Sequence, residues 1–187
     1  KSNGKQNAQA EDELKNYKIE GVEFTYMRVG DISTESVGGK IEVMYGIPVE
    51  LEKILGLTDT RGDHKHSSKE VFDAMKNILL NNTQSKNKLE DYVMTGYGHT
   101  AMPMTDENGV STATNLPIGL YLIIEIKVPA NVNTTVDPFF VSLPMTDEEG
   151  AHWFYDVHVY PKNQTNIPDI DKRVRQHDDV GYGKPEF

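Results

Sequence analysis

The chain has 187 residues, a formal net charge of −10, 37% hydrophobic residues and no cysteine. This length allows one larger domain or two small ones, and the acidic balance argues against a nucleic-acid partner, because phosphate binding needs clustered lysine and arginine. The longest apolar run, GLYLIIEI at 119–126, is too short to span a membrane. Because the chain has no cysteine, the protein either works in a reducing compartment or is stabilised by something other than disulfide bonds.

The first predicted elements are two strands that follow a polar lead-in over residues 1–16. Alternating apolar residues predict a strand over Val22–Val29, and the pair Gly30-Asp31 is expected to end it. Residues 40–46 predict a second strand after a glycine turn at 38–39.

A short helix and a polar loop come next. Proline is favoured at the start of a helix and glycine just past its end, so Pro48 and Gly56 bracket a short helix. Residues 58–66, TDTRGDHKH, are polar throughout and predict a loop. The tripeptide RGD at 61–63 occurs in integrin ligands, but three residues recur by chance too often to assign a receptor.

Two longer helices are predicted after this loop. Ser67 and Glu70 have the spacing of a capping box, in which each side chain bonds the backbone N–H of the other residue. Apolar residues at helical spacing follow to about Leu80, and a second helix is predicted over 83–93. Together these helices form an insertion at about residues 67–93.

The remaining chain returns to the two-residue period of strands. Strands are predicted over 119–129, Phe139–Leu143 and 151–160, with turns at 106–109 and 146–150. Short strands separated by turn residues favour an antiparallel β-sandwich, so we expect a mainly β fold with a short helical insertion.

The last strand ends in an unusual way. Its alternation places Trp153, Tyr155, Val157 and Val159 on one face, and Pro161 and Lys162 follow Tyr160. Proline cannot continue a strand ladder, so it holds the next residue away from the sheet. An amine presented on a stiff base would suit a transfer reaction, although an isolated lysine is most often an ordinary surface residue.

Six residues of this segment form a ten-residue pattern, W-x3-V-x-V-Y-P-K, which comprises Trp153, Val157, Val159, Tyr160, Pro161 and Lys162. The pattern resembles the pilin motif of shaft pilins, the major subunits of sortase-assembled pili of Gram-positive bacteria. The resemblance extends over most of residues 17–163 and includes GVEFTYMRVGD, NLPIGLYLIIEIKVP and PFFVSLPMTDEEG.

The resemblance implies a structural protein that is the substrate of an enzyme. In such pilins a sortase holds the cleaved sorting signal of one subunit as a thioester, and the motif lysine of the next subunit attacks it. Lys162 has that position here, and its amine must be neutral when it attacks. The partners would be other pilin subunits and a pilus-specific sortase, at the cell wall outside a Gram-positive bacterium.

The resemblance also implies an immunoglobulin-like sandwich of the collagen-adhesin B-type, with an internal isopeptide bond between a first-strand lysine and a last-strand asparagine. Asn163 is the matching asparagine, and Glu125 in its apolar strand matches the acid that promotes the reaction. A solvent-facing Glu125 and a turn role for Asn163 are the ordinary alternatives. Lys15 and Lys18 are the nearby candidates but lie in the polar approach segment, so either the bond is absent or its lysine lies upstream of residue 1.

Residues 164–187 are predicted to be a linker and the start of a following, truncated domain, so we expect an N-terminal fragment of a longer pilin. Lys172 resembles the first-strand lysine of such a domain. If the sandwich lacks its first strand, this segment could fill the gap by strand addition.

Several residues outside the pilin motif allow other interpretations. Asp63, His64 and His66 could support a weak metal site or a small hydrolase, but alternating ligands on a loop lack fixed geometry, and we predict no metal or cofactor. Sequons begin at Asn81 and Asn133, as well as at Asn163, and bacterial origin would leave them without glycans. The alternative function is an ancillary pilin or surface adhesin of the same fold that binds a host-surface ligand.

Overall fold

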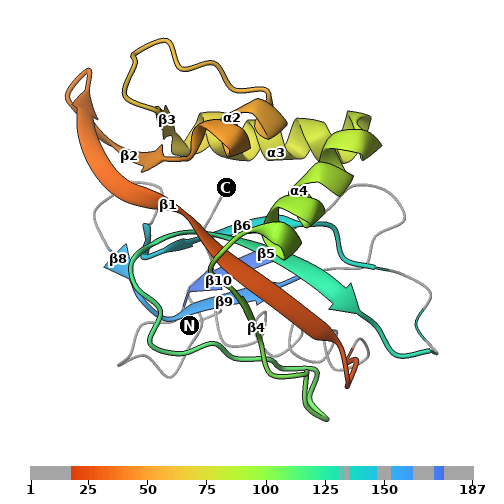
Figure 1. Cartoon of the computed structure of the whole chain (residues 1–187). Coiled ribbons are helices and arrows are strands. Elements are labelled where there is room, and N and C mark those ends of the chain that lie inside the picture. The colour runs from red at the N-terminus through yellow and green to blue at the C-terminus, as the bar shows by residue number, and fades with distance from the viewer. Residues whose placement is uncertain (1–17, 131, 133–134, 147–152, 162–170, 175–187) are drawn as a thin grey trace.

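The computed structural model describes residues 18–130, 132, 135–146, 153–161 and 171–174, and Figure 1 shows their arrangement. The main sheet has the strand order β3-β2-β1-β5-β6, with β4 also paired to β1, and every pair is antiparallel. Its strands are β1 (Glu23–Val37), β2 (Lys40–Gly46), β3 (Lys65–Ser67), β4 (His99–Ala101), β5 (Gly119–Lys127) and β6 (Phe139–Leu143).

Two further antiparallel pairs complete the described strands. The first joins β7 (Met145–Thr146) to β8 (Trp153–Phe154), and the second joins β9 (Val157–Tyr160) to β10 (Asp171–Val174). The mainly β, antiparallel fold class with a helical insertion is therefore confirmed, and the separate sheets agree with an immunoglobulin-like sandwich. The predicted turn at 146–150 lies between β7 and β8, but residues 147–152 are outside the described residues.

Strand β1 is longer than the sequence predicts. The expectation that Gly30-Asp31 ends it is wrong, because the strand continues to Val37, past a bulge between Arg28 and Gly30. One edge of β1 pairs with β5 as far as Gly30, and on the other edge Thr25–Met27 pair with β4 and Asp31–Val37 pair with β2. A Cβ at position 30 would lie 2.9 Å from the backbone oxygen of Gly46, so glycine is needed there for a close approach rather than for a turn.

The short helix α2 (Val49–Leu55) has the predicted limits. Pro48 is its N-cap residue, and Gly56 ends it in the left-handed conformation with φ 70°. The loop that follows is shorter than predicted, because Lys65–Ser67 pair with β2 as strand β3.

The two longer helices are α3 (Ser68–Asn81) and α4 (Thr83–Thr95). The predicted capping box is present: the Glu70 backbone N–H donates to Ser67 Oγ, and the Ser67 backbone N–H donates to Glu70 Oε2. The helix end predicted near residue 93 lies two residues later. Within the described residues, none of the helices combines the length and apolar character that crossing a membrane requires.

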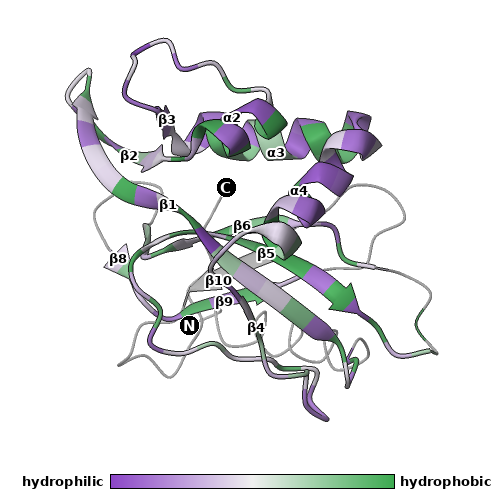
Figure 2. Cartoon of the chain, in the orientation of Figure 1, coloured by the Kyte–Doolittle hydropathy of each residue, from purple (hydrophilic) through white to green (hydrophobic). Residues whose placement is uncertain are grey.

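The three described helices lie on one side of the main sheet, and the core fills the space between them (Figure 1). On β5, alternate residues Leu120, Leu122 and Ile124 face this core and are almost fully buried. The helices contribute side chains that are completely buried, namely Leu51, Val71, Leu89 and Val93. Figure 2 shows the helices with hydrophobic and hydrophilic residues interspersed, as expected for elements with one face on a core.

The opposite face of the same sheet is also buried in its central part. Tyr121 lies across from Val141 and Ile123 across from Phe139 in the ladder between β5 and β6, so these four residues share a face. Tyr121, Val141 and Phe139 are buried, which shows that both faces of the sheet are covered here. The next residue of β5 on this second face is Glu125.

Candidate functional site

The motif segment is divided between two strands. β8 pairs with β7, β9 pairs with β10, and a bend at Tyr155–Asp156 separates them. The prediction of one continuous strand over 151–160 is therefore wrong. The reason is that the segment changes partners at the bend, where Tyr155 and Asp156 are both exposed and belong to neither ladder.

The end of β9 has the form that the motif predicts. Val157, Val159 and Tyr160 are half-buried, Pro161 is half-buried directly after the strand, and Trp153 in β8 is 38% exposed. Because proline has no N–H to extend the ladder, the strand ends at Tyr160, immediately before Pro161. Lys162 and Asn163 lie outside the described residues, so their roles stay predictions.

Strand β10 adds to the motif strand from a distant part of the chain. Asp171–Val174 run antiparallel to β9, with the backbone of Lys172 opposite Val159. These residues belong to the segment predicted to begin a following domain, and they satisfy backbone groups along one edge of β9. This pairing agrees with strand addition by the C-terminal segment, while the bond-forming role of Lys172 stays a prediction.

Glu125 is half-buried on the second face of the main sheet, opposite Phe24 of β1. Its Oε1 accepts a hydrogen bond from the backbone N–H of Val136 at 3.1 Å. Burial raises the pKa of the Glu125 carboxyl, and the hydrogen bond from Val136 opposes this shift. Glu125 therefore does not simply face solvent, and its surroundings favour the protonated form that a promoting acid requires.

The two lysines considered near the start of the chain are not brought to Glu125 by any described contact. Lys18 is exposed, and its Nζ donates to Asn108 Oδ1 at 3.1 Å. Lys15 lies outside the described residues. The two alternatives, an absent bond and a lysine upstream of residue 1, both stay predictions.

Comparison with known families decides the identity of the domain. Residues 1–164 match the model of the Gram-positive pilin subunit D1, N-terminal domain. The chain belongs to this pilin family. The match extends over strands β1 to β9 and the helical insertion and ends two residues after Lys162, so the motif stands at the end of the matched region.

Two relatives carry matching names. The chain is 35% identical over 81 residues to the fimbrial subunit type 2 of Actinomyces naeslundii, and 39% identical over 83 residues to the fimbrial subunit type 1 of Actinomyces viscosus. These alignments cover 42% and 43% of this chain but only 15% of each relative. Pilin subunits are structural proteins, and this assignment replaces the hydrolase interpretation of the histidine loop.

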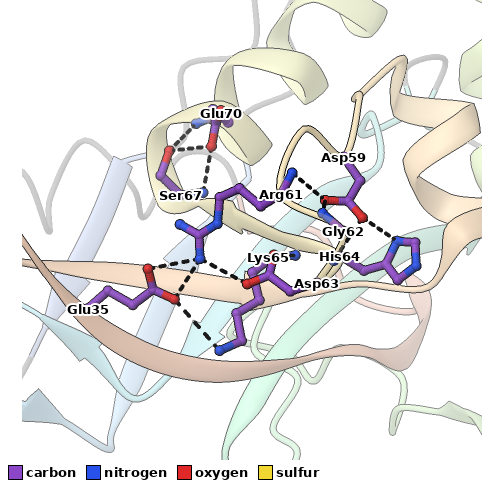
Figure 3. A network of polar contacts seen from close by, with 9 residues as sticks. All are labelled: Glu35, Asp59, Arg61, Gly62, Asp63, His64, Lys65, Ser67 and Glu70. Atoms are coloured by element: carbon purple, nitrogen blue, oxygen red, sulfur yellow. Dashed lines mark hydrogen bonds and ion pairs between the residues drawn. The ribbon is translucent and has the colours of Figure 1, made fainter.

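The RGD tripeptide of the pilin domain takes part in local ion pairs. Arg61 Nη2 donates to both carboxylate oxygens of Glu35 at 2.8 and 2.9 Å, and to Asp63 Oδ2 at 3.0 Å (Figure 3). The hydrogen bond from Arg61, together with its charge, lowers the pKa of Glu35 and of Asp63. These contacts attach the loop to β1 and support a structural role for the tripeptide.

The histidine cluster of the pilin domain differs from the one considered from sequence. Asp63 turns to Arg61, whereas His64 and His66 both contact Glu52 of α2. Asp59 joins them, with Oδ2 at 3.2 Å from His64 Nδ1. Sequence reasoning missed Glu52, although its place between Leu51 and Leu55 on a short helix put it near the buried face.

Proposed function

We propose that this chain is the N-terminal domain of a shaft pilin and that Lys162 is the amine through which a sortase joins it to the next subunit. The observation that carries the proposal is the complete W-x3-V-x-V-Y-P-K motif at the end of a pilin D1 domain match. The proposed location is the outer surface of a Gram-positive bacterium, with the pilus attached to the cell wall. Its partners are other pilin subunits and a pilus-specific sortase.

The proposed reaction is an acyl transfer to Lys162. The neutral Nζ attacks the carbonyl carbon of the sorting signal that the sortase holds as a thioester. A carbon–nitrogen bond forms, the carbon–sulfur bond breaks, the sortase thiolate is released and the amine loses a proton. The product is an isopeptide bond between two subunits, and the pilin contributes the nucleophile while the sortase contributes catalysis.

The local fold supports this role for residue 162. Strand β9 ends at Tyr160, and the half-buried Pro161 fixes the backbone directly before the lysine. A nucleophile that must enter the active site of another protein benefits from a rigid base, since less conformational freedom is lost when it is positioned.

A ligation assay tests the proposal. The chain is mixed with the pilus sortase of its source bacterium and a sorting-signal peptide, and the linked residue is mapped by peptide mass spectrometry. Lys162→Arg removes the nucleophile and keeps the charge, while Lys172→Arg on β10 is the matched control. We expect linkage at residue 162 that is lost in the first variant and retained in the second.

Linkage at another lysine, or none with a sortase that is active on another pilin, would refute the shaft assignment. The same result would favour the alternative of an ancillary pilin or adhesin, because such a subunit need not offer an amine to a following one. Binding of a host-surface ligand would then be the function to measure.

We further propose that Asn163 and Glu125 belong to an internal isopeptide bond whose lysine lies upstream of this chain. The lysine amine would attack Cγ of Asn163, the new carbon–nitrogen bond would replace the amide bond, and ammonia would leave. Glu125 supports the promoting role because it is half-buried and its pKa is raised by burial. Peptide mass spectrometry of the longer pilin should find the cross-link and Glu125→Ala should abolish it. Glu42→Ala, at an exposed position of β2, should not.

A further inference from the structure

A carboxylate is buried on helix α2, far in sequence from the pilin motif. Glu52 on α2 is 4% exposed, and its Oε1 lies 2.7 Å from Nε2 of His66, which is 3% exposed. A buried carboxylate is costly unless it is compensated by an opposite charge or by a metal ion. The surroundings of Glu52 therefore need a source of positive charge.

Three carboxylate oxygens converge on one nitrogen of a second histidine. His64 Nδ1 lies 3.2 and 3.1 Å from Oε1 and Oε2 of Glu52, and 3.2 Å from Oδ2 of Asp59. A single Nδ1 proton forms one good hydrogen bond, so it cannot serve all three oxygens at once. This convergence has the form of a ligand set around a cation.

The charge of the cluster points to a divalent ion. When both imidazoles are neutral, Glu52 and Asp59 together carry two negative charges. The neighbouring cations Arg61 and Lys65 both pair with Glu35 on β1, and Figure 3 shows these side chains directed to that carboxylate.

We propose that Glu52, Asp59 and His64 bind a divalent transition-metal ion of the zinc class. Their ligand atoms all lie within 4.8 Å of one another. Two ligand atoms that are each about 2.1 Å from Zn²⁺ are about 3.0–3.4 Å apart for bond angles between a right angle and the tetrahedral value. The distances of 3.1–3.2 Å between His64 Nδ1 and the carboxylate oxygens fall in this range.

The donor types select the metal class. Imidazole nitrogen with carboxylate oxygen suits zinc, nickel, copper or cobalt, whereas calcium and magnesium prefer oxygen ligands alone. His64 is half exposed, which leaves a path for the ion and for a water ligand at an open position. His64 would bind through Nδ1 as the neutral tautomer that carries its proton on Nε2.

The groups around the proposed ligands hold them in place. His66 orients the Glu52 carboxylate through its Nε2 contact, as outer groups do around metal ligands. Asp59 accepts hydrogen bonds from the backbone N–H groups of Arg61, Gly62 and His64. Desolvation opposes ionisation of Asp59, but these hydrogen bonds outweigh it and lower its pKa.

A metal here would join α2 to the loop after it, and Glu52 also contacts His66 of β3. This connection would attach α2 and its loop to the main sheet, of which β3 is a strand, in a chain that has no cysteine. The metal would therefore stabilise this part of the fold, independently of the sortase linkage proposed at Lys162.

The test uses the whole chain without an affinity tag, freed of metal by chelation and dialysis. Zn²⁺ binding is measured by calorimetry, and Co²⁺ is added as a spectroscopic probe because its visible absorption reports low coordination number. We expect one equivalent of each metal to bind. At a hundredfold excess over Kd, Zn²⁺ should raise the midpoint of thermal unfolding by about 5–10 °C.

Two conservative variants identify the ligands. Asp59→Asn keeps an oxygen for the backbone N–H groups while it removes the charge. His64→Asn removes the imidazole and tolerates the left-handed backbone at this position, where φ is 54°. Asp63→Asn, next to the cluster, and His99→Asn, on exposed β4, are the matched controls.

Each outcome decides the proposal. One equivalent bound by the wild type and both controls, with at least a tenfold loss in Asp59→Asn and His64→Asn, supports it. Absence of binding at micromolar metal, or equal binding in all variants, overturns it. Since circular dichroism will show whether each variant is folded, a loss caused by unfolding is recognised directly.

Discussion

Replacing Leu122 by alanine tests whether the helical insertion packs on the main sheet as described. Leu122 is fully buried on β5, in the core cluster that also contains Phe140 of β6 and Val93 of α4. The substitution removes three carbon groups, each worth about 0.8 kcal/mol of transfer free energy, or about 2.4 kcal/mol in total. The cavity that remains adds to this loss, so we expect the free energy of unfolding to fall by about 3–4 kcal/mol.

Urea unfolding, followed by circular dichroism, measures this loss. With an m-value of about 2 kcal/mol/M, the midpoint should fall by about 1.5–2 M. Ile126→Ala is the matched control, because Ile126 lies on the same face of the same strand but is 41% exposed, and it should cost about 1 kcal/mol or less. Equal midpoint shifts for the two variants would refute the packing of the insertion against this face.

Three further changes test separate parts of the fold. Ser67→Ala removes one side of the capping box with Glu70 and should cost about 0.5–2 kcal/mol in urea unfolding; no loss would show that the cap contributes little. Thr105→Val leaves the buried N–H of Val22 without the hydroxyl that accepts its hydrogen bond, so we expect the free energy of unfolding to fall by about 1–3 kcal/mol. An unchanged urea midpoint would contradict this. Because the raised pKa of Glu125 makes the folded state bind the proton more tightly, stability should fall as pH rises through the folded pKa, and Glu125→Gln should be more stable than wild type at neutral pH. That advantage should vanish below pH 4.5, the ordinary value, and an equal advantage at every pH would contradict this assignment.

The helices were predictable because their end signals are local. Pro48, Gly56 and the pair Ser67 and Glu70 act within one turn of the helix that they begin or end, so their spacing in sequence is enough to locate it. Strand Phe139–Leu143 was likewise found within its limits, since its apolar run is bounded by clear turn residues.

The differences arise where distant segments decide the structure. Gly30-Asp31 has the composition of a turn, but β2 continues the ladder of β1 past the bulge, and that partner cannot be read from local residues. Strand β4 was missed because His99–Ala101 are all exposed and show no apolar alternation; only pairing with β1 defines them. The bend at residues 155–156 likewise depends on two different partner strands.

The candidate site shows the same division. The pilin motif was evident from its residues alone, because six specified positions in ten rarely coincide. The members of the histidine cluster were not evident from the sequence. Asp63, a neighbour in sequence, pairs with Arg61 instead, and Glu52 of helix α2 contacts the histidines. Side-chain direction in a loop depends on the tertiary contacts around it.

The most direct test of the central claim is the cross-link in native pili. Pili isolated from the source bacterium are digested, and branched peptides are identified by mass spectrometry. We predict a peptide in which the Lys162 amine is joined to the cleaved sorting signal of a neighbouring subunit. Unmodified Lys162 throughout the assembled fibre, with the junction at another lysine, would contradict the account.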